Sequence, residues 1–247
     1  MAVAVSIKIR LDKYLADMGL GTRSQIKKEI RSGQITVNGI SICRPEVKID
    51  TGQDKVIFHG EPVTYEEYEY FMLNKPAGVI SAASDCQETT VIDLIRDRKR
   101  DDLFPVGRLD KDTEGLLIIT NNGELAHRLL SPKKHVDKVY FARINGRVTQ
   151  SDVDNFSRGM DIGDEKPTLP ADLVICTSDE VSEIRLTIRE GRFHQVKRMF
   201  QAVGKEVVYL KRLRMGSIAL DESLKPGEYR RLTEEEVERL CSQERKP

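Results

Sequence analysis

The densest group of side chains that could carry out chemistry lies in residues 107–115, with the sequence GRLDKDTEG. It holds three carboxylates within five residues, and an apolar run suited to a buried strand follows at residues 116–119. An ionised carboxylate fixed beside such a strand can serve as a nucleophile or as a general base. Because Asp and Gly are also favoured in turns, the spacing alone leaves a plain turn as the alternative.

Continued through residues 121–130, this segment resembles the catalytic signature of the RsuA-type rRNA pseudouridine synthases. Three further stretches match other motifs of that family in the same order: residues 74–78 (NKPAG), 138–140 (KVY) and 190–199 (EGRFHQVKRM). One such motif alone is a weak signal, whereas four in order are specific. The resemblance implies an isomerase that converts a uridine of ribosomal RNA into pseudouridine, with no cofactor and no metal.

The resemblance also implies roles for three side chains. The essential aspartate falls on Asp110, which would attack or deprotonate the target nucleoside while its C1′–N1 bond breaks. Tyr140 falls on the tyrosine that receives the base, which must leave its stack to be reached. Lys197 falls on the basic partner of the aspartate, and such a cation keeps a carboxylate ionised. Asp112 and Glu114 are interpreted as turn residues.

Further basic side chains are expected to bind RNA around this site. By resemblance, Arg108 would fill the space that the flipped base leaves, or hold its phosphate. Lys75 and Arg192 are further candidates for RNA contacts, with a turn role as the alternative for Lys75. For Arg198 we keep the simpler interpretation of a solvated helix face. Tyr140 also has an alternative, as an aromatic side chain in the core of a strand.

The stretch that leads to the tyrosine, residues 130–140 (LSPKKHVDKVY), looks more like the small-subunit branch of the family than the large-subunit branch. Lys133, Lys134 and Lys138 lie just before the proposed base platform and could hold the phosphates on either side of the target. We therefore expect small-subunit 16S rRNA to be the substrate, with large-subunit 23S rRNA as the alternative.

A separate RNA-binding module is indicated near the N-terminus. Residues 10–15 (RLDKYL), 33–39 (GQITVNG) and 52–54 (GQD) resemble the S-four-type module that a ribosomal protein and several RNA-modifying enzymes share. Residues 7–33 carry seven basic side chains against three acidic ones, a net charge of +4. The side chains expected to face RNA are Arg10, Arg23, Lys27, Lys28 and Arg31.

The net charge of the chain and the distribution of charge along it point to different partners. Forty basic and forty acidic residues leave a formal net charge of zero, which by itself argues against nucleic acid as a partner. However, residues 185–214 carry nine basic side chains against two acidic ones, a net charge of +7. Two segregated basic stretches favour binding to a polyanion, although any single charge run is more often a solvated face.

Composition excludes several other classes of protein. The chain has no run of about 20 apolar residues and no signal-type start, so we expect a cytoplasmic protein with no membrane partner. No P-loop or G-x-G-x-x-G is present, which argues against a nucleotide cofactor. The four cysteines are widely separated and the histidines lack ligand spacing, so neither zinc nor disulfides are expected. We expect a monomer.

The elements that must position these residues alternate irregularly, which predicts an α+β fold. We expect a small N-terminal S-four-type module in residues 1–60, a linker in residues 61–70, and a catalytic domain in residues 71–247 built on a mixed, mainly antiparallel sheet with flanking helices. Helices are predicted near residues 11–18, 22–33, 91–98, 123–130, 151–159, 193–203 and 234–241, a hairpin at 35–42, and strands at 71–73, 79–80, 115–120, 138–144, 173–177, 184–188 and 207–210.

Two other functions are compatible with parts of this sequence. A glycoside hydrolase also uses two carboxylates, held ~5–10 Å apart, but it would need aromatic platforms for sugar. This chain has no Trp and only 6% aromatic residues. A non-catalytic RNA-binding protein, such as a ribosome-assembly factor, is the other alternative. Loss of Asp110, Tyr140 or Lys197 would indicate it, and all three are present.

Overall fold

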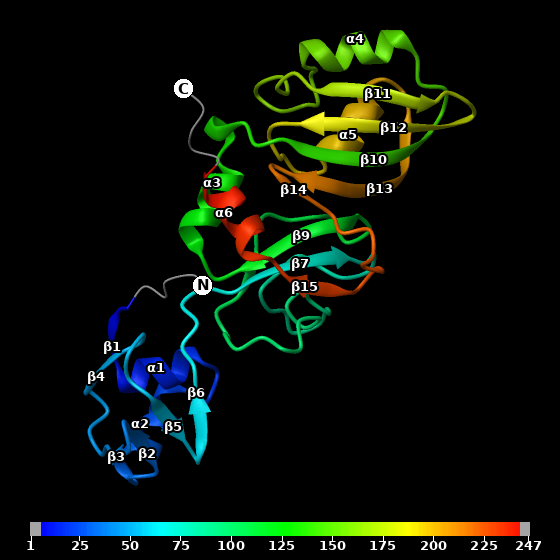
Figure 1. The fold of residues 1–247 in the computed structure, drawn as a ribbon. Coiled ribbons are helices and arrows are strands. Elements are labelled where there is room, and N and C mark those ends of the chain that lie inside the picture. Colours follow the sequence, from blue (N-terminus) through cyan, green and yellow to red (C-terminus); the bar gives the residue numbers. More distant parts are fainter. Residues whose placement is uncertain (1–5, 243–247) are drawn as a thin grey trace. The chain divides into compact units, whose positions relative to one another are not determined.

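The computed structural model describes residues 6–242, which fall into two compact units (Figure 1). The first unit comprises the chain up to residue 69 together with residues 96–103. The second comprises residues 70–95 and the chain from residue 104 onward. Across the described part of the chain, no helix has both the length and the apolar character that a membrane crossing requires.

The first unit packs two helices on short strands. Its elements are β1 (Lys8–Arg10), α1 (Leu11–Asp17), α2 (Arg23–Arg31), β2 (Ile35–Val37), β3 (Ile40–Ser41), β4 (Lys48–Asp50), β5 (Val56–Phe58) and β6 (Glu61–Val63). Strands β3-β2-β5-β6 form one sheet, and β1 pairs with β4. The predicted capping box is present, because Thr22 accepts a hydrogen bond from the backbone N–H of Gln25 and the Gln25 side chain accepts one in return. The apolar faces of α1 and α2 bury Leu11, Leu15, Ile26 and Ile30.

The expected linker at residues 61–70 is in part structured. Glu61–Val63 pairs with β5 as strand β6, because the edge of β5 offers unpaired backbone groups to the next segment. Glu69 is buried, and its carboxylate accepts hydrogen bonds from the backbone N–H groups of Lys99 and Arg100. These contacts bring residues 96–103 into the first unit, a return of the chain that the sequence did not indicate.

The second unit is built on one large sheet. Its strands are β7 (Tyr70–Lys75), β8 (Phe104–Pro105), β9 (Glu114–Thr120), β10 (Lys138–Asn145), β11 (Asp172–Thr177), β12 (Val181–Ile188), β13 (Glu206–Met215), β14 (Ile218–Ala219) and β15 (Tyr229–Arg231). The main order is β11-β12-β10-β13-β9-β7-β15. Among the described strands of this sheet only β9 and β13 pair in parallel, so the predicted mixed, mainly antiparallel sheet is confirmed.

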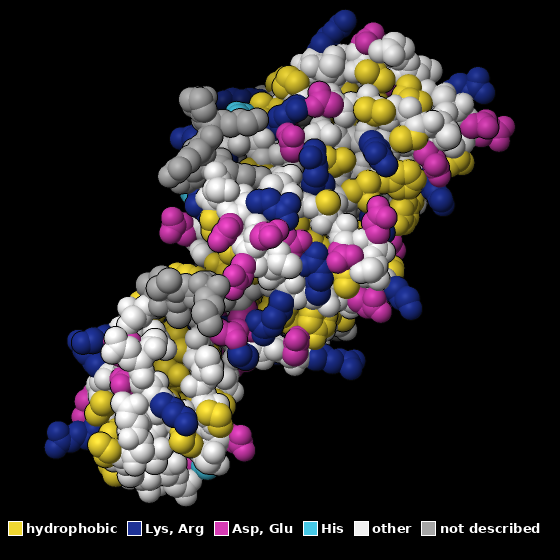
Figure 2. All heavy atoms as spheres, in the orientation of Figure 1, with side chains coloured by type: hydrophobic (Ala, Val, Ile, Leu, Met, Phe, Trp, Pro, Cys, Tyr) yellow, Lys and Arg dark blue, Asp and Glu magenta, His cyan; other side chains and the backbone are white. Residues whose placement is uncertain are grey.

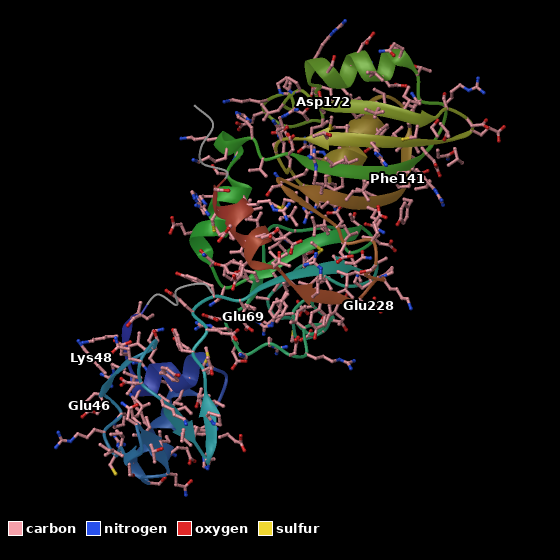
Figure 3. All side chains as sticks on the ribbon, in the orientation of Figure 1. Glu46, Lys48, Glu69, Phe141, Asp172 and Glu228 are labelled. Carbon is pink, nitrogen blue, oxygen red and sulfur yellow. The ribbon has the colours of Figure 1, made fainter. Side chains whose placement is uncertain are left out.

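Helices cover the sheet and close its core. They are α3 (Gly123–Leu130), the 3₁₀ turn η1 (Pro132–Lys134), α4 (Gln150–Arg158), α5 (Gln195–Ala202) and α6 (Glu234–Ser242). In Figure 1, α5 lies against one face of the β10–β13 part of the sheet. Side chains alternate along β10, so that Tyr140 is buried while Phe141 belongs to the opposite face. Figure 3 labels Phe141, whose ring lies 6.1 Å from that of Tyr209.

The helix predicted near residues 91–98 is wrong. Val91, Ile92 and Ile95 are buried as their apolar character suggests, but the segment forms turns. Asp93 accepts hydrogen bonds from the backbone N–H and the hydroxyl of Thr90, which closes a local turn in place of a helical one. From residue 96 the chain then leaves for the first unit, so tertiary contacts override the local helical pattern.

Candidate active site

A cavity of about 730 Å³ in the second unit brings the carboxylate segment against the sheet. Its walls include residues 107–111 on one side and the first turn of α5 on the other. From the sheet, Tyr140 of β10 and Arg212 of β13 face it, and these two residues are direct cross-strand partners. Cross-strand partners point to the same face of a sheet, so the register itself places both side chains in the cavity.

Asp110 lies in the loop between β8 and β9, with 27% of its side chain exposed. Its Oδ2 is 3.6 Å from Nζ of Lys197, and its Oδ1 is 3.6 Å from Nε2 of His194. Both partners come from the start of α5, where His194 adopts a left-handed backbone (φ 48°) as the N-cap residue. The carboxylate is thus accessible and faces positive charge, as a nucleophile or base requires.

Lys197 is shared between two carboxylates. Its Nζ lies 2.7 Å from both oxygens of Asp112, closer than to Asp110. The hydrogen bond from Lys197 lowers the pKa of Asp112 below its ordinary value. Asp112 was expected to be a turn residue only, and the structure adds to that a contact with the lysine next to Asp110.

The position of Lys75 fits the turn role that the sequence left as the alternative to an RNA contact. The side chain is fully buried, and its Nζ donates hydrogen bonds to the backbone carbonyls of Pro76, Asp110, Lys111 and Thr113 at 2.9–3.2 Å. Burial lowers its pKa to about 8. Lys75 therefore holds the loop that carries Asp110 and has no access to phosphate.

Tyr140 and Lys138 share the inner face of β10. Tyr140 is 7% exposed and lines the cavity, which fits a stacking platform as well as a core position. Lys138 was grouped with Lys133 and Lys134 as a phosphate contact, but it is buried and bonds only to the carbonyl of Val136 among the described residues. The alternation that turns Tyr140 inward also turns Lys138 inward.

Arg192, predicted to contact RNA, is bound by neighbouring groups of the protein. Its guanidinium pairs with Glu190 and Asp164 and also donates to the carbonyls of Lys166 and Pro167. These bonds occupy the fork that a phosphate would need. Arg198 is likewise not a solvated side chain, because it bonds to Asp164 and to the carbonyl of Ile162. The two arginines anchor the loop before β11 to α5.

The remaining basic candidates are exposed. Arg108 lines the cavity and is exposed, whereas Lys133 and Lys134 are exposed on η1 outside the cavity lining. In the first unit, Lys28 and Arg31 project from α2. Figure 2 shows blue and magenta side chains interspersed over the visible face, so the charge segregation seen along the sequence is not a single basic face in this view.

Three basic side chains of the first unit converge on one buried carboxylate. Arg10 makes two hydrogen bonds of 3.0 Å to Asp12, while Arg23 and Lys27 lie 3.4 and 3.8 Å from it. Burial raises the pKa of Asp12, but hydrogen bonds from Arg10 and Arg23 outweigh it and leave the pKa below its ordinary value. About half of each cation's side chain remains exposed, so each can still reach RNA.

Sequence reasoning missed three cavity residues. Phe193, 75% exposed, stacks on His194 with ring centroids 3.8 Å apart, and both lie inside the motif at residues 190–199, in which only basic residues receive a role from the sequence. Arg212 was counted only as charge, yet it is buried in the cavity wall. Arg212 lies two residues after the apolar Leu210 on β13, and this spacing puts both side chains on the buried face of the strand. That spacing is the signal that could have predicted its burial. Within residues 6–242, no three side chains of His, Cys, Asp or Glu gather into a group that could hold a metal ion.

Comparison with known proteins gives consistent matches. The pattern of the RNA pseudouridylate synthases matches residues 69–202, and that of the S4 domain matches residues 9–55. A Bacillus subtilis (strain 168) protein described as the uncharacterized RNA pseudouridine synthase YtzG is 47% identical, over 94% of this chain and 98% of that protein. The ribosomal small subunit pseudouridine synthase A of Salmonella typhimurium (strain LT2) is 41% identical and that of Escherichia coli (strain K12) 40%, each over 93% of this chain and 98% of theirs. A crystal structure of a pseudouridylate synthase, 40% identical, superposes with a TM-score of 0.66 over 94% of this chain and 99% of that one.

Proposed function

Because the chain belongs to the RNA pseudouridylate synthase family and carries an S4 domain before its catalytic region, we propose that it converts one uridine of small-subunit 16S rRNA into pseudouridine, with Asp110 as the essential carboxylate. The chain is an enzyme of the isomerase class, and ribosomal RNA is its substrate. The assignment of small-subunit rRNA as the substrate rests on the 40–41% identity to small-subunit enzymes over nearly the whole chain.

The cavity can support this reaction with the side chains that it contains. A flipped uridine would enter it, with Tyr140 beside the base and Asp110 beside the ribose. Asp110 either attacks C1′ or removes a proton from the sugar, and in both routes the C1′–N1 bond breaks. The base then turns and rejoins C1′ through C5. Lys197 and His194 face the carboxylate, each with a nitrogen 3.6 Å from one of its oxygens. Since uridine and pseudouridine are isomers, no oxidant or reductant is consumed.

We further propose that the protein acts as a monomer in the cytoplasm, with the S4 domain holding a second part of the folded rRNA. The exposed cations of α2 support such a contact. Two separated contacts would favour folded rRNA over a short stem-loop, on which we expect poor activity.

The test has two parts. The purified protein is incubated with C5-tritiated small-subunit or large-subunit rRNA, and tritium release reports the new bond at C5. Pseudouridines are then mapped in both rRNAs from a deletion strain and its parent. We expect one small-subunit site to disappear. A loss confined to the large subunit would overturn the substrate assignment and keep the chemistry, and no release from any RNA would point to a binding role without catalysis.

A further inference from the structure

Arg212 is a buried cation whose hydrogen-bonding capacity is mostly unused. It is 2% exposed, and its Nε donates a hydrogen bond of 2.8 Å to the carbonyl of Leu116. Its Nη2 is buried and has no hydrogen-bond partner, and among residues 6–242 no carboxylate lies within ion-pair distance of the guanidinium. Buried charges in proteins are normally paired, and an orphaned buried donor calls for an explanation.

A second buried cation lines the same cavity. Lys138 is 6% exposed, and its Nζ has one hydrogen bond, to the carbonyl of Val136. Burial, together with the nearby charge of Arg212, lowers the pKa of Lys138 to about 8. Both residues line the cavity that contains Asp110. Asp137 and Glu190 act on the charge of Lys138, whereas no carboxylate pairs with Arg212 among the described residues. The Arg212 part of this wall therefore suits a ligand that brings negative charge.

A purely structural role explains Arg212 poorly. The bond to Leu116 needs one donor, which a neutral side chain could supply without burying a charge. The backbone is also placed by the parallel pairing of β13 with β9, where Gly115 (φ 101°) lies opposite. A Cβ at position 115 would come within 2.2 Å of the carbonyl oxygen of Arg212. The close approach holds Arg212 in place and leaves its guanidinium beside Tyr140, its partner on β10.

We propose that the guanidinium of Arg212 binds a carbonyl oxygen of the flipped uracil and stabilises the negative charge that the base acquires when the C1′–N1 bond breaks. This inference rests on the proposed function. The base, and not a phosphate, is assigned to Arg212 because a flipped nucleotide enters a cavity base first while its phosphates stay at the rim. Arg108, exposed at the cavity, is placed for phosphate, whereas Arg212 is buried in the wall.

The negative charge on the uracil follows from where the electrons and protons go when the glycosidic bond is exchanged. When the C1′–N1 bond breaks, its electron pair stays with N1, and the charge spreads to O2 and O4 of the ring. A new bond then joins C5 to C1′ while the Asp110–C1′ bond breaks, or, in the other route, while the sugar takes back the proton that Asp110 removed. The C5 proton leaves, and N1 takes up a proton. The base is thus anionic only between the two bond changes. A fixed cation in a water-poor cavity acts most strongly at that stage.

The test measures single-turnover tritium release and RNA affinity for the wild type, Arg212→Ala, Arg212→Lys and Arg214→Met. Arg214 is the matched control, because it is an exposed arginine of the same strand. We expect Arg212→Ala to slow turnover about 100-fold while RNA affinity changes less than about 3-fold. Arg212→Lys should recover part of the rate, and Arg214→Met should stay close to the wild type. Added guanidinium, at a concentration well below that which unfolds the protein, should accelerate Arg212→Ala at least about 5-fold, whereas equal urea or NaCl should not.

Several results would contradict the proposed role of Arg212. An Arg212→Ala rate within about 3-fold of the wild type, or a loss that neither guanidinium nor Arg212→Lys recovers, overturns it. A drop in RNA affinity with no change in the single-turnover rate would assign Arg212 to phosphate and also overturn it. If Arg212→Ala does not unfold cooperatively, Arg212→Lys and Arg212→Gln are compared in its place, and equal rates in the two contradict a role for the charge. A wild type that releases no tritium from any rRNA contradicts the proposed function instead.

Discussion

At the scale of single residues, the two aspartates beside Lys197 can be separated by experiment. Asp110→Asn keeps the shape of the side chain but removes the nucleophile or base, so we expect turnover to fall by roughly 10⁴-fold or more while RNA binding stays within a few-fold. Asp112→Asn should stay active, within about 5-fold of the wild type, because Lys197 remains 3.6 Å from Asp110 and loses its competing partner. Single-turnover tritium release and filter binding give both quantities. An indispensable Asp112 with a dispensable Asp110 would reverse the assignment.

Lys75 makes a pH-dependent contribution to the stability of the fold. Burial lowers its pKa from 10.5 to about 8, so the unfolded chain takes up this proton first as the pH falls. Lys75 should therefore contribute a rise of about 3 kcal/mol to the free energy of unfolding between pH 8 and pH 10.5. Lys75→Met should lack this contribution and keep the one from Lys138, whose pKa burial also lowers to about 8. Urea denaturation across this range measures the difference. Lys111→Met, which removes an exposed ion pair with Glu88, is the control that should keep the rise, and parallel curves for the wild type and Lys75→Met would contradict the assignment.

At the scale of elements, α2 should determine how strongly RNA binding depends on salt. Each phosphate contact contributes roughly 0.7–0.9 to the slope of log K against log salt, so the double variant Lys28→Gln/Arg31→Gln should reduce that slope by about 1.4–1.8. Lys48→Gln removes a cation from β4 of the same unit and should leave the slope unchanged (Figure 3). Filter binding at several salt concentrations provides the slopes. Equal slopes for the double variant and the wild type would show that α2 does not contact phosphate.

Elements whose determinants are local were predictable, and those fixed by distant contacts were not. The start of α2 follows from Thr22 and Gln25, three residues apart, and the inner face of β10 follows from simple alternation. The turns at residues 91–98 follow from the crossing of the chain between units. The role of Lys75 depends on carbonyls some 35 residues away, which no local pattern encodes. The same holds for Arg212, whose surroundings arise from the β9–β13 pairing.

At the scale of the whole molecule, the division into units predicts where a truncated protein becomes vulnerable. A fragment of residues 70–247 keeps residues 96–103 but loses Glu69 and Asp17, which bond to Lys99 and Arg100 in the full chain. We expect trypsin to cut this fragment after Arg100 at least about 10-fold faster than the full chain, because a buried site must open before it is cleaved. Timed digestion with mass spectrometry provides the rates. In the full chain, the rate of cleavage within exposed α2 serves as the internal reference for an accessible site. Equal rates after Arg100 would show that the segment is held without the first unit.

The return of residues 96–103 to the first unit also sets an order of events during synthesis. Residue 69 emerges from the ribosome 34 residues before residue 103, and until then Glu69 and Asp17 lack the segment that bonds to them. At the usual rate of chain elongation this interval is about 2–7 s. The N-terminal unit therefore cannot complete its folding before the first strand of the catalytic unit, β7, has been made. A nascent chain arrested before residue 96 should show an unfinished N-terminal unit under force or pulse proteolysis, and one arrested after residue 103 has cleared the exit tunnel should resist both.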